Sequence, residues 1–166
     1  MDLNQLLSVE PFDWPSISTA ILCGGIIGFE RQLRGKPVGI RTSALIVLGT
    51  YMFIAASMLI KTEFSDPSRI IGQVVTGVGF LGAGVMLAKE GVVVGVTSAA
   101  TIWVLAGVGV IIAVISPIVA IKFAVLIVGI LYGVDVLEGY STRFTQGAHS
   151  KINKWRKKDR RNSEHQ

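Results

Sequence analysis

Long apolar stretches without charged residues alternate with short polar segments along this chain of 166 residues. A stretch of this kind is typical of a transmembrane helix, because at ~1.5 Å per residue about 20 residues cover the ~30 Å hydrocarbon core of a bilayer. The pattern predicts the first three membrane spans over residues 15–29, 42–60 and 70–88.

The apolar stretch over 91–121 is too long for one span. It contains Ser116 and Pro117, and a proline both removes a backbone donor and disfavours helix in the residue before it. We therefore predict a fourth span over 97–115, preceded by a re-entrant turn at 92–96, and a fifth span over 117–137. The predicted fold class is all-α, a polytopic membrane protein with a bundle of about five transmembrane helices.

Small residues recur at helical spacing in these spans. Such stripes let helix backbones approach closely, which is how helices associate in lipid. We expect the helix over 66–86 to be the packing centre of the bundle. Its stripe consists of Gly72, Thr76, Gly79 and Ala83, and the first span has a similar strip of Ala20, Gly24 and Gly28.

Positive charge is concentrated in two places. The short segment over 30–41 holds four basic residues, and eight of the 16 Lys and Arg residues lie from Arg143 onward. The positive-inside bias puts both groups in the cytoplasm and the acidic N-terminus outside, which requires an odd number of spans. We predict a membrane domain over 1–138 and a basic cytoplasmic tail over 139–166.

The basic tail explains the net charge of +5, so nucleic acid is not an expected partner. Phe144, Ala148, Ile152 and Trp155 follow a helical spacing among its basic residues, which suits a helix lying on anionic lipid. A disordered basic end that mainly fixes the membrane topology is an equally good interpretation.

The composition is that of a membrane protein, with 51% apolar and 16% charged residues. Transporters usually keep an ionisable group near the bilayer midplane, where an ion must be held. The deep polar residues here are uncharged: Thr50, Ser57, Gln73, Thr76 and Thr101. Gln73 has the best functional claim among them, and the alternative is an amide that bonds across to another span.

The sequence gives little support for a metal site or for an enzyme active site. Magnesium takes one or two carboxylates, which Glu63 with Asp66, or Glu30 with Glu90, could supply. Acidic loop residues are usually only solvated, and Asp66 with Pro67 also forms an ordinary helix start. No metal ligand set or cofactor is assigned. The chain has no nucleophile and base that can be paired, and we expect no enzymatic activity. Cys23, the one cysteine, is expected to be a small buried apolar residue.

Three segments together resemble the MgtC/SapB family of bacterial inner-membrane proteins. They are GFERQLRGKPVGIRT at 28–42, DPSRIIGQVVTGVGFLGAG at 66–84 and GVVVGVTSAATIW at 91–103. The resemblance implies a five-span, multi-pass protein of the inner membrane with a cytoplasmic C-terminus. The chain differs from longer family members, which add a folded cytoplasmic domain. Val94 also stands where many members carry arginine.

The resemblance also implies candidate functional residues in each segment. Glu30, Arg31 and Arg41 lie where the inner ends of the first two spans meet, so an ion-paired cluster is a natural hypothesis. The full set is Glu30, Arg31, Arg34, Gly35, Arg41 and Thr42 in the first segment, Asp66, Arg69, Gln73, Gly79 and Gly82 in the second, and Thr97 and Trp103 in the third.

The family is associated with growth in low magnesium, with acid stress, with survival inside macrophages and with inhibition of the F-type ATP synthase. The resemblance therefore implies a non-enzymatic protein that supports magnesium or acid-stress adaptation by modulating another membrane protein, with the F-type ATP synthase as one such partner. The alternative function is a divalent-cation transporter. A third is a structural homo-oligomer, because small-residue faces can also pair copies of one chain.

Overall fold

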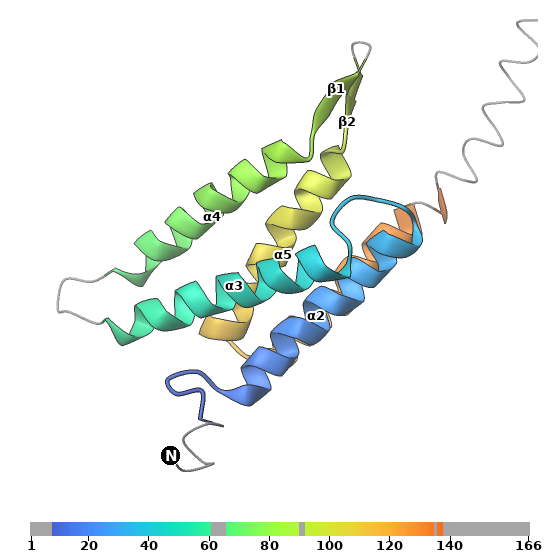
Figure 1. The fold of residues 1–166 in the computed structure, drawn as a ribbon. Coiled ribbons are helices and arrows are strands. Elements are labelled where there is room, and N and C mark those ends of the chain that lie inside the picture. The colour runs from blue at the N-terminus through green and yellow to red at the C-terminus, as the bar shows by residue number, and fades with distance from the viewer. Residues whose placement is uncertain (1–7, 61–65, 90–91, 135, 138–166) are drawn as a thin grey trace, which may run out of the picture. The chain divides into compact units, whose positions relative to one another are not determined.

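The computed structural model describes residues 8–60, 66–89, 92–134 and 136–137. The structure contains two short strands, β1 (Leu87–Lys89) and β2 (Val92–Val94), which lie between its third and fourth labelled helices. The chain divides into two compact units, Met1–Val128 and Gly129–Gln166. The helices are α2 (Trp14–Leu33), α3 (Ile40–Leu59), α4 (Pro67–Gly84) and α5 (Val96–Val114), all in the first unit, and a last helix over Pro117–Val134 (Figure 1).

Some predictions lie outside the described residues. These are the tail helix through 144–155, the carboxylates Glu63 and Glu90, and the boundary between residues 138 and 139.

The described helices confirm the predicted polytopic all-α fold. α3, α5 and the helix over Pro117–Val134 are each long and apolar enough to cross a membrane. α2 has 20 residues and α4 has 18, and they coincide with the predicted first and third spans, although both carry more polar side chains. The side of the membrane that each end faces stays a prediction.

The predicted break near Pro117 is confirmed. α5 ends at Val114, and the next helix begins at Pro117. The Ser116 hydroxyl oxygen accepts a hydrogen bond from the Ile118 N–H at 3.2 Å, which satisfies one of the free donors of a helix start.

The core of the first unit lies where α2, α3 and α5 meet (Figure 1). Glycines allow these helices to approach closely: a Cβ atom on Gly24 would lie 2.6 Å from the Ala44 Cα, and one on Gly28 would lie 2.6 Å from the Ile40 Cα. The predicted strip on the first span is therefore a true helix contact. Large side chains that are fully buried in this core include Ile27, Val47, Ile54, Ile102 and Leu105.

α4 is not the packing centre that its glycine content predicted. Val78 and Gly82 are its only buried residues among the described positions. Gly82 contacts α5, where an added Cβ would lie 3.7 Å from the Ala99 Cβ. A Cβ on Gly79 would have no atom within 4 Å, so the predicted helix contact at Gly79 is wrong within this chain. A stripe of small residues permits a close contact but does not say which helix fills it.

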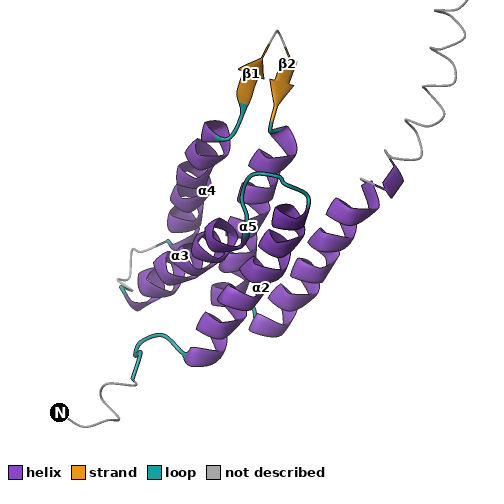
Figure 2. Ribbon diagram, turned by 45° about the vertical axis from the view of Figure 1, so that its right-hand side comes forward, coloured by secondary structure: helices purple, strands orange, loops and turns teal. Residues whose placement is uncertain are grey.

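A β-hairpin replaces the predicted re-entrant turn at 92–96. β1 and β2 pair antiparallel, with Leu87 opposite Val94, and project beyond the ends of α4 and α5 (Figures 1 and 2). The run of β-branched valines from 92 to 94 favours a strand over a helical turn. Gly95 then enters α5 at a φ of 92°, and any Cβ there would collide with the Val85 carbonyl oxygen.

Candidate functional site

The first predicted segment forms a sharp corner between α2 and α3. Gly35 adopts the left-handed φ of 61°, its N–H donates to the Gln32 carbonyl at 3.1 Å, and the Lys36 N–H donates to the Arg31 carbonyl at 3.0 Å. These two bonds are the standard glycine-dependent end of a helix. Glu30 and Arg31 therefore lie in the last turn of α2. The sequence pattern had instead placed residues 30–41 in a polar loop.

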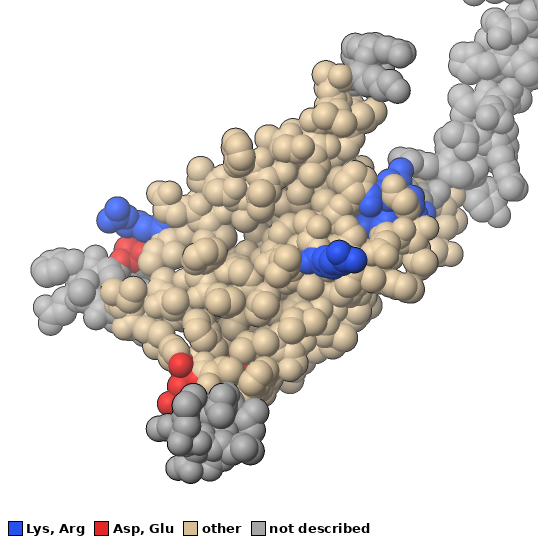
Figure 3. All heavy atoms as spheres, viewed as in Figure 1, with Lys and Arg blue, Asp and Glu red and all other residues tan. Residues whose placement is uncertain are grey.

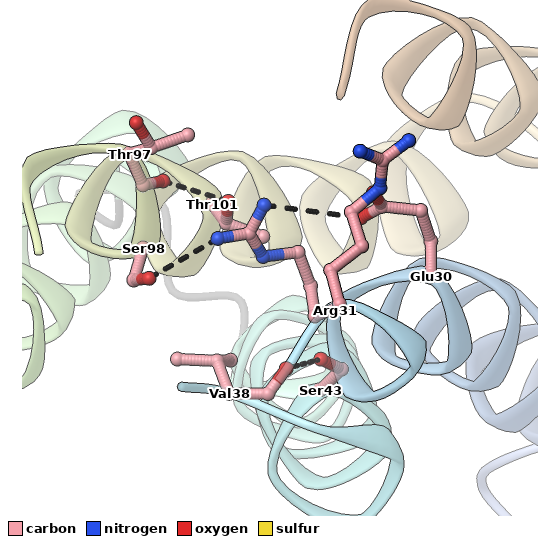
Figure 4. A network of polar contacts seen from close by, with 8 residues as sticks. Glu30, Arg31, Val38, Ser43, Thr97, Ser98 and Thr101 are labelled. Carbon is pink, nitrogen blue, oxygen red and sulfur yellow. Dashed lines mark hydrogen bonds and ion pairs between the residues drawn. The ribbon is translucent and has the colours of Figure 1, made fainter. Parts of the chain in front are cut away.

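Val38 carries backbone strain in the same corner. Its φ is 70°, a conformation that β-branched residues rarely adopt, and its side chain is buried. The Ser43 hydroxyl donates to the Val38 carbonyl at 3.1 Å, which holds the strained residue against the first turn of α3 (Figure 4).

A buried charged cluster, formed by Glu30, Arg31 and Arg34, lies at this end of α2. Only 7% of Glu30 and 2% of Arg31 are exposed. The Arg31 Nη1 lies 3.8 Å from the Glu30 Oε2, and the Arg34 Nε pairs with the Glu30 Oε1. The predicted ion pair of Glu30 with arginine is therefore present, and a freely solvated Glu30 is excluded.

The cluster reaches across to the start of α5. The Arg31 Nη2 donates to the Ser98 Oγ at 3.2 Å, and the guanidinium group points toward Ser98 and Thr101 (Figure 4). Thr101 is buried, and its hydroxyl donates to the Thr97 carbonyl at 2.8 Å. Because Arg31 and Ser98 are 67 residues apart, this contact fastens α2 to the segment that follows the hairpin.

The electrostatics of the cluster are finely balanced. A guanidinium group beside the first turn of α5 faces the positive end of the helix dipole, which is unfavourable, and the Glu30 carboxylate offsets this charge. The Arg31 Nε and both Glu30 oxygens are buried without hydrogen-bond partners of good geometry in the described structure. A buried ion pair of this kind contributes little net stability but is costly to break, because removing one partner leaves a buried charge.

Arg41 and Thr42 do not belong to the cluster, which corrects the hypothesis that Arg41 pairs with Glu30. α3 begins at Ile40, so Arg41 lies on its first turn, and both residues are exposed. The sequence pattern ended the first span too early, which placed residue 41 in the same polar loop as Glu30.

The second predicted segment provides a helix start and an open surface. The Asp66 Oδ1 accepts from the Ser68 N–H at 2.9 Å, so its predicted role as a helix cap is confirmed. The Ser68 side chain, and then the Ser68 backbone N–H, lower the pKa of Asp66 from its ordinary value by hydrogen bonding to the carboxylate. Arg69 and Gln73 are exposed, and Gln73 makes no cross-helix hydrogen bond within the described residues.

The third segment contributes a residue that sequence reasoning missed. Thr97 and Trp103 were predicted, but both are exposed, and Thr97 acts only through its backbone carbonyl. Ser98, one position further, is 2% exposed and binds Arg31. The sequence feature that could have identified Ser98 is the adjacent pair of hydroxyl residues at the start of a helix. Which of the two points inward depends on how the helix is rotated about its axis.

The described residues contain no group of three or more His, Cys, Asp or Glu side chains placed to hold a metal ion. What the cluster can do is mechanical. It fixes the C-terminal end of α2 to the start of α5.

Comparison with known proteins places these segments in context. Residues 17–140 match the model of the MgtC family. The chain is 48% identical over 106 residues to the Escherichia coli K12 protein named "Putative magnesium transporter YhiD", covering 58% of this chain and 47% of YhiD. No solved structure matches the chain.

Two similar relatives carry the name MgtC. Identity is 46% over 95 residues to protein MgtC of Brucella abortus strain 2308, covering 57% of this chain and 39% of that protein. It is 45% over 95 residues to protein MgtC of Salmonella typhimurium strain LT2, covering 57% and 40%. The chain matches less than half the length of these curated relatives.

Proposed function

The chain belongs to the MgtC family, and from this premise we propose that it supports adaptation to low magnesium or acid stress by modulating another membrane protein, without enzymatic activity. It is a multi-pass protein of the bacterial inner membrane. The magnesium-related name of its relative YhiD supports the physiological setting.

The observation that carries the modulator proposal is the docking face of α4, which we define as Gly72, Thr76, Gly79 and Ala83. All four residues are exposed, and Cβ atoms on Gly72 and Gly79 would meet nothing within 4 Å. The charged side chains visible in Figure 3 lie near helix ends, and the surface of α4 between them is uncharged. An exposed small-residue face on a helix in lipid is suited to close packing with another helix.

The buried cluster supports the same proposal by making the rest of the bundle rigid. Arg31 ties α2 to α5 through Ser98, while glycines hold α2 and α5 closely against α3. A partner helix that binds α4 would therefore meet a surface whose supporting helices are already held in place.

The test is growth at limiting magnesium of a bacterial strain that lacks its own copy of this protein. The variant Gly79→Leu should fold normally, because the added side chain enters open space, yet it should fail to restore growth. The matched control is Gly25→Leu, which also adds a side chain where no atom lies within 4 Å, but on α2. The proposal is wrong if Gly79→Leu restores growth as well as the unmodified chain at equal membrane abundance.

Cross-linking identifies the partner. Cysteine introduced as Gly79→Cys, in a chain carrying Cys23→Ala, should give a specific adduct with a maleimide cross-linker in native membranes. The family resemblance makes a subunit of the F-type ATP synthase one candidate partner. An adduct of twice the chain mass would instead assign the docking face to a second copy.

A divalent-cation transporter is the second candidate function, and it is favoured by the name of the relative YhiD, which is called a "putative magnesium transporter". In that case the buried Glu30 would be the natural ion ligand, since magnesium prefers carboxylate oxygens. A transporter should take up magnesium as the purified protein alone, whereas a modulator should act only when its partner protein is present.

A further inference from the structure

A groove of about 720 Å³ runs between α3 and α4. It lies on the opposite face of α4 from the docking face, because Gly77 and Leu81 line it while Gly72 and Gly79 do not. Gly49 and Gly77, one on each wall, would have no atom within 4 Å of an added Cβ. A side chain added at either glycine would therefore have room to enter the groove.

One end of the groove is marked by positive charge. Leu45, Gly49 and Phe53 line it at four-residue spacing on α3, and Arg41 continues the same spacing one turn earlier. Arg41 is exposed, and no acidic side chain pairs with it in the described part of the chain. Thr42, beside it, lines the groove directly.

The start of α3 strengthens this charge. The helix begins after Gly39, which has no side chain to cap it, and the Ile40 N–H donates only a long 3.4 Å bond to the Gln32 side chain. The first-turn N–H groups and the positive end of the helix dipole are therefore available to an anion beside Arg41.

The length of the groove matches one leaflet of a bilayer. From Thr42 to Phe53 the helix rises about 17 Å, compared with ~15 Å for half of the ~30 Å hydrocarbon core. On the α4 wall the lining covers a similar length, from Leu81 back to Ile70. This length is short for a helix from another chain that crosses both leaflets, and it suits an acyl chain that starts at Arg41.

We propose that the groove between α3 and α4 binds one acyl chain of an anionic phospholipid, whose phosphate contacts Arg41 and the first turn of α3. The apolar walls recognise the chain, and the charge at the mouth selects the headgroup. This site is independent of the docking face of α4, and it gives Arg41 a role outside the buried cluster.

The test is native mass spectrometry of the purified full chain in detergent with equal amounts of phosphatidylglycerol and phosphatidylcholine. Arg41→Gln should lower retention of phosphatidylglycerol relative to phosphatidylcholine by about fivefold, because one basic residue near an anionic headgroup contributes ~1 kcal/mol. Lys36→Gln, which removes the same charge from the exposed loop between α2 and α3, should change this ratio less than about twofold. The comparison of the two variants removes any contribution of the basic tail, which both retain.

Filling the groove provides the second arm. Gly77→Leu should reduce retention of both lipids, and Gly79→Leu, on the opposite face of the same helix, should not. Gly49→Leu repeats the test from the other wall, and circular dichroism identifies any variant that fails to fold. The proposal is overturned if Arg41→Gln and Lys36→Gln behave alike, if folded Gly77→Leu or Gly49→Leu retains lipid normally, or if Leu45→Cys cross-links to a second protein chain.

Discussion

At the scale of single residues, Arg31 is the side chain that joins the buried charged cluster to α5. It is 2% exposed, pairs with Glu30 and donates to Ser98. Arg31→Met should lower the free energy of unfolding by about 3–5 kcal/mol, because it leaves the Glu30 carboxylate buried with less compensation. The double variant Glu30→Gln with Arg31→Met should recover part of that loss, since the buried side chain at position 30 then carries no charge.

Thermal unfolding of the purified variants in detergent measures this coupling. Arg41→Gln is the control, and as a surface substitution it should shift stability by no more than about 0.5 kcal/mol. Equal destabilisation by Arg31→Met and Arg41→Gln would show that the buried cluster does not hold α2 to α5.

Local chemistry made some residue roles predictable and left others open. Asp66 and Pro67 were recognisable as a helix start because the cap and the first helical position depend only on neighbours in the chain. Ser98 was missed and Arg41 was placed in the wrong cluster, because the surroundings of each residue depend on which face of its helix it occupies and on which helix that face meets. The hydrogen bond from Arg31 to Ser98 spans 67 residues, and no local pattern encodes it.

At the scale of elements, glycines decide which helices touch. Gly24→Ala should destabilise the protein by about 1–3 kcal/mol, because the new methyl group would lie 2.6 Å from the Ala44 Cα and force α2 away from α3. Gly25→Ala, the neighbouring control, has open space and should be neutral or stabilise by up to about 1 kcal/mol. Chemical or thermal unfolding compares the two, and a reversed order would contradict the assigned α2–α3 contact.

Spacing alone correctly predicted the contact at Gly24 and Gly28 but not the environment of Gly79. Both stripes look alike in sequence, since each repeats small residues every three or four positions. In the first unit, the stripe on α2 faces α3, and the stripe on α4 faces away from both α3 and α5. The difference lies in tertiary placement, and the same open stripe is what supports a docking role.

At the scale of the whole molecule, the apolar pattern was sufficient to predict the helices. The predicted spans over 42–60 and 97–115 agree with α3 and α5 within two residues, and the break at Pro117 is where the sequence placed it. Long charge-free stretches leave few alternatives in a membrane, because every backbone polar group must be bonded within the helix. The hairpin escaped prediction because it is short and its valines are as apolar as the spans around it.

We propose that the protein acts by modulating a partner rather than by moving ions itself. Magnesium uptake into liposomes that contain the purified, folded chain, followed with an indicator dye inside, tests this claim most directly. We expect magnesium uptake equal to that of protein-free liposomes, for the unmodified chain and for Glu30→Gln alike. Saturable uptake that Glu30→Gln abolishes, while the variant remains folded, would rule out a pure modulator and make the protein a transporter.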